Sequence, residues 1–314
     1  MRPSASATGV RLCPACAATE VIAGFEPLWP SGWRCKTCEH AVEVRDGIPL
    51  FAPDLADAET GFDTAVFDEL ARHEEGHFWF EPRSRLLTGL AAKFFPAAGH
   101  YLEIGCGTGV VLKAMAAQHF WSRLAGSELH PAGLSHAIRR LGDQAEFVQM
   151  DARHIPAREA FDLIGAFDVL EHIAEDENVL REVHAALVPG GGFIAAVPQH
   201  PVLWSEADNL AHHVRRYRRG ELERKLRSAQ FEILFSSSYA SVVLPLMAAS
   251  RFKSRRAAAD KLVVHELSVH PFLNTILRAA LEVEVNLTLK GFGWPLGGSR
   301  IVVARKSRLH AARR

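Results

Sequence analysis

Residues 101–109 read Y-L-E-I-G-C-G-T-G, an apolar run that ends in an acid and three glycines at alternate positions. Gly105, Gly107 and Gly109 are followed by V-V-L-K-A-M-A-A with helical spacing, so the order indicates a strand, a tight turn and a helix. Glycine at such a turn allows φ above zero and lets a ligand lie against the backbone, next to the N–H groups of the helix. The pattern predicts a nucleotide-like cofactor at this turn.

Two common phosphate-binding motifs do not fit this spacing. A dinucleotide fingerprint, G-x-G-x-x-G, needs its third glycine at the position of Val110, and no Gly-Lys-Ser/Thr follows for a P-loop. Acids stand on both sides of the turn instead. Glu103 comes before the first glycine, and Glu128 closes the next apolar run about 20 residues past the turn, the distance expected for an acid that binds a ribose.

At these motifs the chain resembles the class I S-adenosylmethionine (SAM)-dependent methyltransferases of the small-molecule, type 11/12-like kind. The resemblance covers residues 81–240, where a third apolar run ends at Asp151 and a fourth carries Asp168, Glu171 and His172. It implies that the glycine turn holds the methionine part of SAM, that Glu128 binds the ribose and that Asp151 pairs with the adenine amine. The implied cofactor residues are Arg83, Glu103, Gly105, Gly107, Gly109, Glu128, Leu129, Asp151, Ala152 and Asp168.

The fold class that follows is α/β. Near-continuous apolar runs such as F-D-L-I-G-A-F and F-I-A-A-V fit a parallel sheet covered on both faces, and the segments between them have apolar residues at i, i+3 and i+4. Alternating strands and helices imply a doubly wound sheet. The resemblance implies seven Rossmann-like strands, and we expect a helical insertion before the last strand.

Four of the five cysteines lie ahead of this domain, in two C-x-x-C pairs. Cys13 and Cys16 form one pair, Cys35 and Cys38 the other, and this spacing is typical of a tetrahedral zinc site with four thiolates. Disulfides would need an oxidising compartment, and M-R-P-S-A-S-A-T-G-V lacks the apolar stretch of a secretory signal. We therefore expect a structural zinc ribbon, similar to the small partner proteins of some methyltransferases, in a cytoplasmic protein.

The expected domains are a zinc ribbon (1–53), a linker with pre-core helices (54–98), the methyltransferase core (99–239), a helical lid (240–298), and the last strand with a basic tail (299–314). The pre-core segment contains H-F-W-F-E-P-R-S-R. In similar enzymes such a segment closes over the cofactor, and Arg83, or else Arg85, would reach the methionine carboxylate. The alternative is an aromatic cluster that only docks a helix on the sheet.

Size and composition fit a soluble enzyme. The chain has 314 residues, 48% of them hydrophobic, and a formal net charge of zero, so no global field attracts nucleic acid. The longest apolar stretch, residues 239–249, is about half of what a bilayer span needs and contains Pro245. We expect no transmembrane segment.

Catalytic groups should lie beyond the carboxyl ends of strands four and five, where open α/β sheets bind ligands. The loop after strand five, within residues 198–222, offers His213 as a general base and Tyr217 as a residue that orients the acceptor. His172, beside Glu171 at the end of strand four, is a further candidate. The alternative for the loop is a solvated, arginine-rich helix start.

The insertion has helical stretches that we expect to cover the acceptor site. Its apolar face lies near Arg251, Lys253, Arg255 and Arg256 in the sequence, which suits contact with a membrane surface or a lipid-like acceptor. The alternative is a helical cover packed on the core.

Three functions fit these observations. The first is a SAM-dependent methyltransferase with a small-molecule, apolar or lipid-like acceptor. The second is an RNA methyltransferase whose ribbon and arginine cluster (Arg215, Arg216, Arg218 and Arg219) bind phosphates, with strongly salt-dependent binding as its mark. The third is a non-catalytic scaffold, which would not bind SAM. The intact acids Glu103, Glu128 and Asp151 favour an enzyme over a scaffold.

Overall fold

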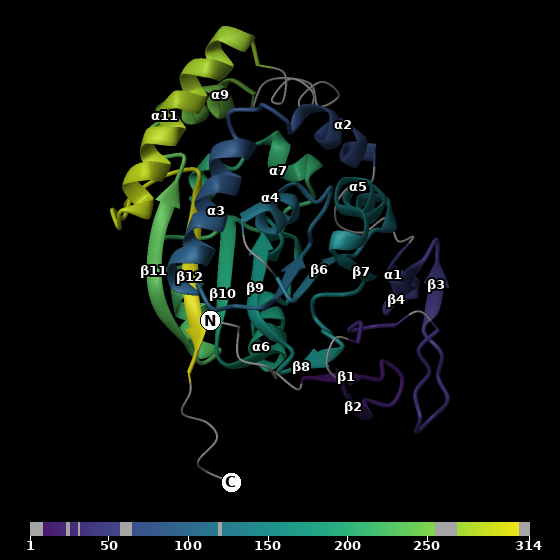
Figure 1. Ribbon diagram of the computed structural model, residues 1–314. Coiled ribbons are helices and arrows are strands. Elements are labelled where there is room, and N and C mark those ends of the chain that lie inside the picture. Colours follow the sequence, from purple (N-terminus) through teal and green to yellow (C-terminus); the bar gives the residue numbers. More distant parts are fainter. Residues whose placement is uncertain are drawn as a thin grey trace.

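The computed structural model describes residues 9–22, 26–30, 32–56, 65–118, 121–254 and 269–307 (Figure 1). Among these residues, nine strands form one sheet in the order β11-β12-β10-β9-β5-β6-β7-β4-β3. The strands are β3 (Glu43–Arg45), β4 (Ile48–Leu50), β5 (His100–Ile104), β6 (Arg123–Glu128), β7 (Glu146–Gln149), β9 (Phe161–Phe167), β10 (Leu187–Pro198), β11 (Phe231–Tyr239) and β12 (Ser299–Lys306).

The predicted doubly wound sheet is confirmed. Strands β7, β6, β5, β9 and β10 run parallel to their neighbours, and β12 lies antiparallel between β10 and β11. These seven strands correspond to the seven that the sequence predicts, and the last one in the chain fills the gap between the fifth and the sixth. The carboxyl ends of the parallel strands therefore meet at one edge, where a ligand binds in such sheets.

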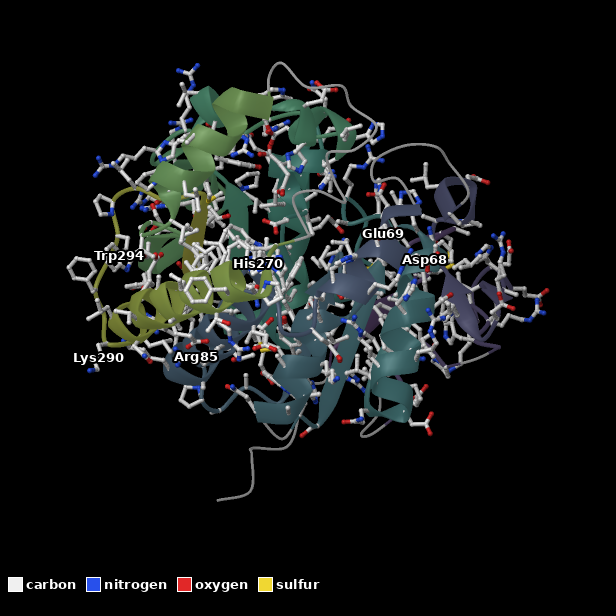
Figure 2. All side chains as sticks on the ribbon, turned by 90° about the horizontal axis from the view of Figure 1, so that it is seen from above. Asp68, Glu69, Arg85, His270, Lys290 and Trp294 are labelled. Atoms are coloured by element: carbon white, nitrogen blue, oxygen red, sulfur yellow. The ribbon has the colours of Figure 1, made fainter. Side chains whose placement is uncertain are left out.

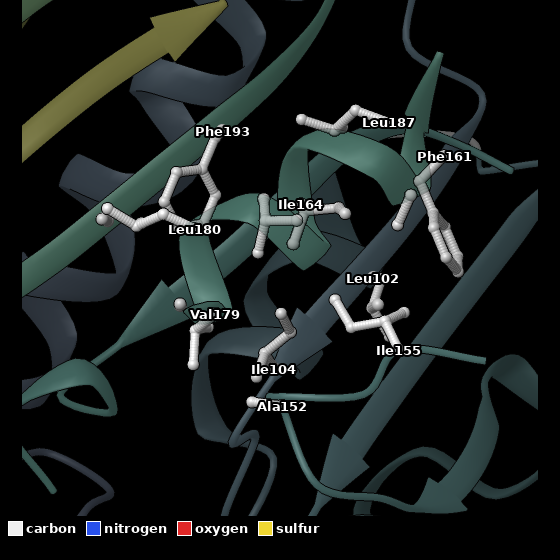
Figure 3. Packing of buried hydrophobic residues seen from close by; sticks show 14 of the residues in the cluster. Leu102, Ile104, Ala152, Ile155, Phe161, Ile164, Val179, Leu180, Leu187 and Phe193 are labelled. Carbon is white, nitrogen blue, oxygen red and sulfur yellow. The ribbon is translucent and has the colours of Figure 1, made fainter. Parts of the chain in front are cut away.

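Helices cover both faces of the sheet because successive strand residues point to opposite sides. Helices α3 (Phe80–Phe94), α4 (Val110–Gln118) and α5 (Pro131–Leu141) pack on the face that includes Tyr101, and α11 (Pro271–Leu289) packs on α3. On the other face, Leu102 and Ile164 lie in one cluster with Val179 and Leu180 of α6 (Asp176–Ala186), and α8 (Glu221–Ser228) joins them (Figure 3).

The N-terminal module extends the core sheet, which the sequence does not predict. Its hairpin, β3 and β4, adds to the edge strand β7, with Leu50 paired in parallel to Gln149. A second contact pairs β1 (Val10–Leu12) with β8 (Ala157–Arg158), and β2 (Thr19–Val21) completes that small sheet. Leu28 and Trp29 are buried in the same cluster as the core strands. The module is thus an integrated part of the fold.

The remaining elements are short helices in the connections between strands and in the insertion. They are α1 (Pro53–Ala56), α2 (Ala65–His73), η1 (Gly142–Gln144), η2 (Leu170–His172), η3 (Pro201–Leu203), α7 (Glu206–Leu210) and α9 (Leu244–Ser254). Residues 57–64 of the predicted linker and 255–268 of the predicted insertion, including Arg255 and Arg256, lie outside the described residues. Among the helices that are described, none is both long and apolar enough to cross a membrane.

Candidate active site

The turn between β5 and α4 has the backbone conformation that its glycines predict. Gly105, Gly107 and Gly109 have φ of 64°, 51° and 80°, which residues with a Cβ rarely adopt. A Cβ on Gly105 would also lie 2.4 Å from a methyl of Val169. Both conformation and space therefore require glycine here.

Glu128, at the end of β6, is held against this turn. Its Oε2 accepts a hydrogen bond from the Gly107 N–H at 3.1 Å, and its Oε1 accepts one from the Leu129 N–H at 2.7 Å. Burial raises the pKa of this carboxyl, and the two backbone donors partly offset the increase. The acid that the sequence assigns to the ribose thus lies beside the glycine turn.

Glu103, at the end of β5, is buried in the same region. The hydroxyl of Tyr101 donates to its Oε2 at 2.9 Å. Burial raises the pKa of Glu103 to about 8, although the Tyr101 hydroxyl and the charge of Arg83 act in the opposite direction. Glu103 is therefore mostly neutral at pH 7 in the ligand-free protein.

One cavity of about 470 Å³ brings most of the predicted residues together. Its lining includes seven predicted cofactor residues and two predicted catalytic residues, which are Arg83, Glu103, Gly105, Gly107, Glu128, Leu129, Asp168, His172 and His213. Gly109, Asp151, Ala152 and Tyr217 are not among the residues that line it. The cavity spans the carboxyl ends of β5, β6, β9 and β10, so the cofactor and acceptor candidates share one space.

Asp151, which the resemblance assigns to the adenine amine, contacts Arg153. Its two carboxylate oxygens lie 3.0 and 2.9 Å from the Arg153 Nε. Burial alone would raise the pKa of Asp151, but the hydrogen bonds from Arg153 lower it. The carboxylate is therefore ionised and paired, and its adenine role stays a prediction.

The two candidate arginines of the pre-core segment have different surroundings. Arg83 lies in the cavity wall, where its Nη2 is 2.7 Å from Asp168 Oδ2. Asp168 has a φ of 56°, a strained conformation that turns its side chain at the end of β9. Arg85 instead pairs with Glu282 and donates to Asn286, both on α11. Arg85 therefore fastens α11 to α3, and Arg83 is the arginine beside the site.

Helix α2 and the residues after it cover the glycine turn, which the sequence does not predict. Phe67 of α2 lines the cavity, and a Cβ on Gly133 would lie 3.1 Å from its ring. Buried Glu74 accepts a hydrogen bond from the Thr108 hydroxyl at 2.7 Å and pairs with Arg140 at 2.6 Å. Together these contacts fix the segment that follows α2 to the glycine turn and to α5.

His213 is positioned by an aspartate at the cavity wall. Its Nδ1 lies 2.9 Å from Asp208 Oδ1, which also accepts from Arg216 Nε at 2.6 Å. Burial would raise the pKa of Asp208, but His213 and Arg216 lower it well below its usual range. An ionised Asp208 favours the tautomer that carries a proton on Nδ1 of His213. Nε2 then has the free lone pair.

Glu171 and His172, in η2 after β9, lie close to the His213 ring. Glu171 Oε1 lies 3.9 Å from His213 Nε2, and the His172 ring packs edge-on against the His213 ring at 4.7 Å between centroids. Burial, followed by the charge of Asp168, raises the pKa of Glu171 well above its ordinary value. Burial lowers the pKa of His172 to about 3. Glu171, His172 and His213 also present ligand atoms within 4.8 Å of one another, close enough to share a metal ion.

Tyr217 lies behind this wall. It is fully buried, and its hydroxyl donates to Asp176 Oδ2 at 2.6 Å. Burial, together with the Asp176 carboxylate, raises its pKa. The same carboxylate binds Lys225 Nζ at 2.6 Å. Tyr217 thus joins the loop to α6 and α8, and its contact with the acceptor stays a prediction.

A family profile described as "Methyltransferase domain" (Methyltransf_23) matches residues 71–235, more than half of the chain. The chain belongs to this methyltransferase family. The match begins in α2 and ends in β11, so it contains the glycine turn, both buried acids and the His213 loop.

Curated relatives of the methyltransferase match part of its length. A ubiquinone biosynthesis O-methyltransferase of Pseudomonas aeruginosa is 30% identical over 131 residues, which are 39% of this chain and 50% of the relative. A trans-aconitate 2-methyltransferase of Paracidovorax citrulli is 35% identical over 106 residues, 33% of this chain and 40% of the relative. The chain thus spans about half, or less, of the length of these relatives.

Solved structures share the fold. One is a chain from the complex between the Haloferax volcanii Trm112 methyltransferase activator and a methyltransferase, with a TM-score of 0.53 and 17% identity over 79% of this chain and 95% of that one. At this identity the likeness concerns the fold alone. It agrees with the doubly wound sheet described above.

The four N-terminal cysteines form a cluster that can hold a metal ion. The Sγ atoms of Cys13 and Cys38 are 3.6 Å apart, those of Cys16 and Cys35 are 3.7 Å apart, and all four lie within 4.8 Å of one another. A disulfide needs sulfurs about 2 Å apart. Four thiolates at about 2.3 Å from a tetrahedral zinc would be separated by about 3.8 Å, which fits the observed spacing.

Proposed function

We propose that the chain is a SAM-dependent methyltransferase that methylates a hydroxyl group of a small, apolar acceptor. The observation that carries this proposal is the shared cavity, which has the glycine turn and Glu128 on one side and His213, held by Asp208, on the other. The family match and the names of the relatives, which include an O-methyltransferase, support the same class of reaction.

The chain's own residues would hold the cofactor in the order that the sequence predicts. Glu128 would accept from the ribose hydroxyls, and the glycine turn would leave space for the methionine part. Arg83 and Glu103, which both line the cavity, would pair with the carboxylate and the ammonium of that part. When bound, SAM supplies a methyl group on a sulfonium for in-line transfer, a reaction that depends mainly on alignment.

His213 would take the proton of the acceptor hydroxyl on Nε2. Asp208 accepts from Nδ1 and stabilises the imidazolium that forms, while Arg216 keeps Asp208 ionised. Glu171, whose Oε1 lies 3.9 Å from His213 Nε2, lines the same part of the cavity and would contact the acceptor beside the base. In this proposal His172 packs against the base, and Tyr217 supports the loop from behind.

The test compares three variants in a radiolabelled methyl-transfer assay with an alkyl-substituted catechol as the probe. His213→Ala should lower turnover by roughly two to four decades, the usual contribution of a general base. Asp208→Asn should also lower it, because the wrong tautomer is then favoured. His212→Ala is the matched control, since this neighbouring histidine is exposed and does not line the cavity.

Calorimetry with S-adenosylhomocysteine completes the test. Its affinity should be the same in all three variants, because the cofactor residues are intact. Unchanged turnover in His213→Ala would remove the residue from the mechanism. Activity that requires added Mg²⁺, a cation that the four thiolates do not favour, would show that His213 is a metal ligand instead, with Glu171 and His172 as partners.

We further propose that the four-cysteine cluster binds zinc and that this zinc is structural. Four thiolates fill a tetrahedral site and leave no position for a substrate.

The arginine cluster gives the alternative of an RNA methyltransferase less support. Arg215 pairs with Asp176 at 3.0 Å and Arg216 with Asp208 at 2.6 Å, so two of its four guanidinium groups already bind internal carboxylates.

A further inference from the structure

Helix α11 is apolar on two opposite sides. One side packs on the protein, where Leu281 and Val285 are fully buried among residues of α3 and the sheet. Buried Glu284 on this side accepts hydrogen bonds from the Ser241 and Val242 N–H groups, which fixes the start of the α9 segment to α11. The packing of α11 is thus satisfied without its other side.

The other side is a continuous apolar stripe in solvent. Its residues recur at helical intervals of three and four, and they are Phe272, Ile276, Ala279, Val283 and Leu287. Phe272 is 72% exposed and Val283 58% exposed. At about 1.5 Å per residue, the stripe is roughly 23 Å long. In Figure 2, α11 runs across the face turned to the viewer, from His270 to Lys290.

The segment that follows α11 carries further apolar groups. Phe292 and Leu296 are each about half exposed, and the Trp294 ring stacks edge-on against Phe292 at 4.8 Å between centroids. The Trp294 Nε1–H donates to the Thr288 hydroxyl at 3.0 Å. Aromatic side chains with a polar tip are typical of the boundary between water and lipid. Figure 2 shows Trp294 near Lys290, at the end of the helix.

Charges near the stripe favour an anionic surface. On the flanks of α11, Arg278 pairs with Glu81 and Glu282 pairs with Arg85, so these acids are already neutralised. Shortly before α11, residues 251–261 read R-F-K-S-R-R-A-A-A-D-K, with five basic residues and one acid in a chain of zero net charge. In a sequence, a basic run followed by an apolar helix is typical of segments that bind anionic lipids.

We propose that the α11 stripe docks this protein on an anionic lipid surface. A second copy of the chain fits less well, because a two-fold contact would turn each stripe toward its equivalent, and the stripe has no acid to pair with exposed Lys290 at the end of the helix. Helix α11 is bonded through its packed side to the residues just before α9, and Met247 of α9 lines the cavity, so a single helix separates the element that carries the stripe from the cavity. Resting on the proposed function, this position makes the acceptor a lipid-soluble molecule taken from the bilayer.

Vesicle co-sedimentation of the full chain tests the docking surface. The wild type should bind vesicles of phosphatidylcholine and phosphatidylglycerol, and bind pure phosphatidylcholine at least roughly tenfold more weakly at low salt. Val283→Glu should abolish binding by placing a charge in the middle of the stripe. Val21→Glu, which makes the same change at a 60% exposed position of the ribbon, should bind like the wild type.

Two results would overturn the proposal. If Val283→Glu folds normally and still binds the vesicles, the lipid contact lies elsewhere. If the wild type does not bind anionic vesicles at all, the stripe does not dock on such a surface. Concentration-dependent dimers that Val283→Glu abolishes would identify a second copy as the occupant. Calorimetry with S-adenosylhomocysteine separates this test from that of the proposed function, because vesicle binding does not need the cofactor and Val283 does not line the cavity.

Discussion

The buried carboxyl of Glu103 should make the stability of the protein depend on pH. Its pKa rises from an ordinary 4.5 to about 8 in the folded protein, mainly because it is buried. Between these two values the native state holds a proton that the unfolded chain has released, so the free energy of unfolding falls as pH rises. At about 1.4 kcal/mol per unit, the loss between pH 5 and pH 7 is about 3 kcal/mol.

The variant Glu103→Gln isolates this contribution. Glutamine stays neutral at every pH and can still accept the hydrogen bond from Tyr101. Thermal unfolding at pH 5 and pH 7 should therefore show a smaller decrease in the variant than in the wild type. The difference is roughly 6 to 12 °C, from about 2 to 4 °C per kcal/mol in a domain of this size. Glu177→Gln, at an exposed position of α6, is the matched control.

The affinity for SAM should rise with pH over the range in which the free energy of unfolding falls. The ammonium and the sulfonium of SAM favour an ionised Glu103, so binding at pH 7 should release about 0.9 of a proton from a group with this pKa. Calorimetry in buffers of different ionisation enthalpy measures that proton, and Glu103→Gln should not release it. Parallel pH profiles for the wild type and Glu103→Gln would refute the reasoning, since Glu103 would then titrate normally or make no contribution.

Two further predictions concern the N-terminal module and its contact with β7. Cys35→Ser should reduce bound zinc from one ion per chain to almost none and lower the unfolding temperature, as metal analysis and scanning calorimetry would show; iron, or paired disulfides, would contradict the assignment. Gln149→Leu should weaken S-adenosylhomocysteine binding roughly tenfold, measured by calorimetry, by removing the hydrogen bond to the Leu129 carbonyl, next to Glu128, together with the one to the Ala52 carbonyl. Gln144→Leu, at an exposed position, is its control, and equal affinities in the two variants would disprove the link.

The parts of the site that the sequence predicts are those that depend on local chemistry. A strand, a glycine turn and a helix specify their own geometry, and the acids at the ends of β5 and β6 follow from the direction of the strands. Glu103, Glu128 and the glycine turn are accordingly where the sequence places them, in one cavity wall. The C-x-x-C pairs likewise predict their cluster, because each turn presents two sulfurs on one side.

The parts that the sequence does not predict depend on tertiary contacts. Asp208 reaches His213 because both lie on a loop that folds back on β10, and Arg216 then shares the same carboxylate. Only the spacing S-x-x-D, which predicts the capping box of α7, was a local sign that Asp208 is fixed. Tyr217 appears as an active-site residue in the sequence and is buried against Asp176 in the structure, since loop spacing does not specify which side faces the cavity.

The placement of the ribbon connects its metal cluster to the cofactor site through one buried amide. The Gln149 side chain accepts from the Ala52 N–H at 3.0 Å and donates to the Ala52 carbonyl at 2.8 Å and to the Leu129 carbonyl at 3.0 Å. Leu129 in turn donates its N–H to Glu128. A buried amide that loses its partners is costly, so residue Ala52 of the N-terminal module and the Glu128–Leu129 segment stabilise each other. Because such coupling is reciprocal, a ribbon that folds around its metal should strengthen cofactor binding, and a bound cofactor should strengthen metal retention.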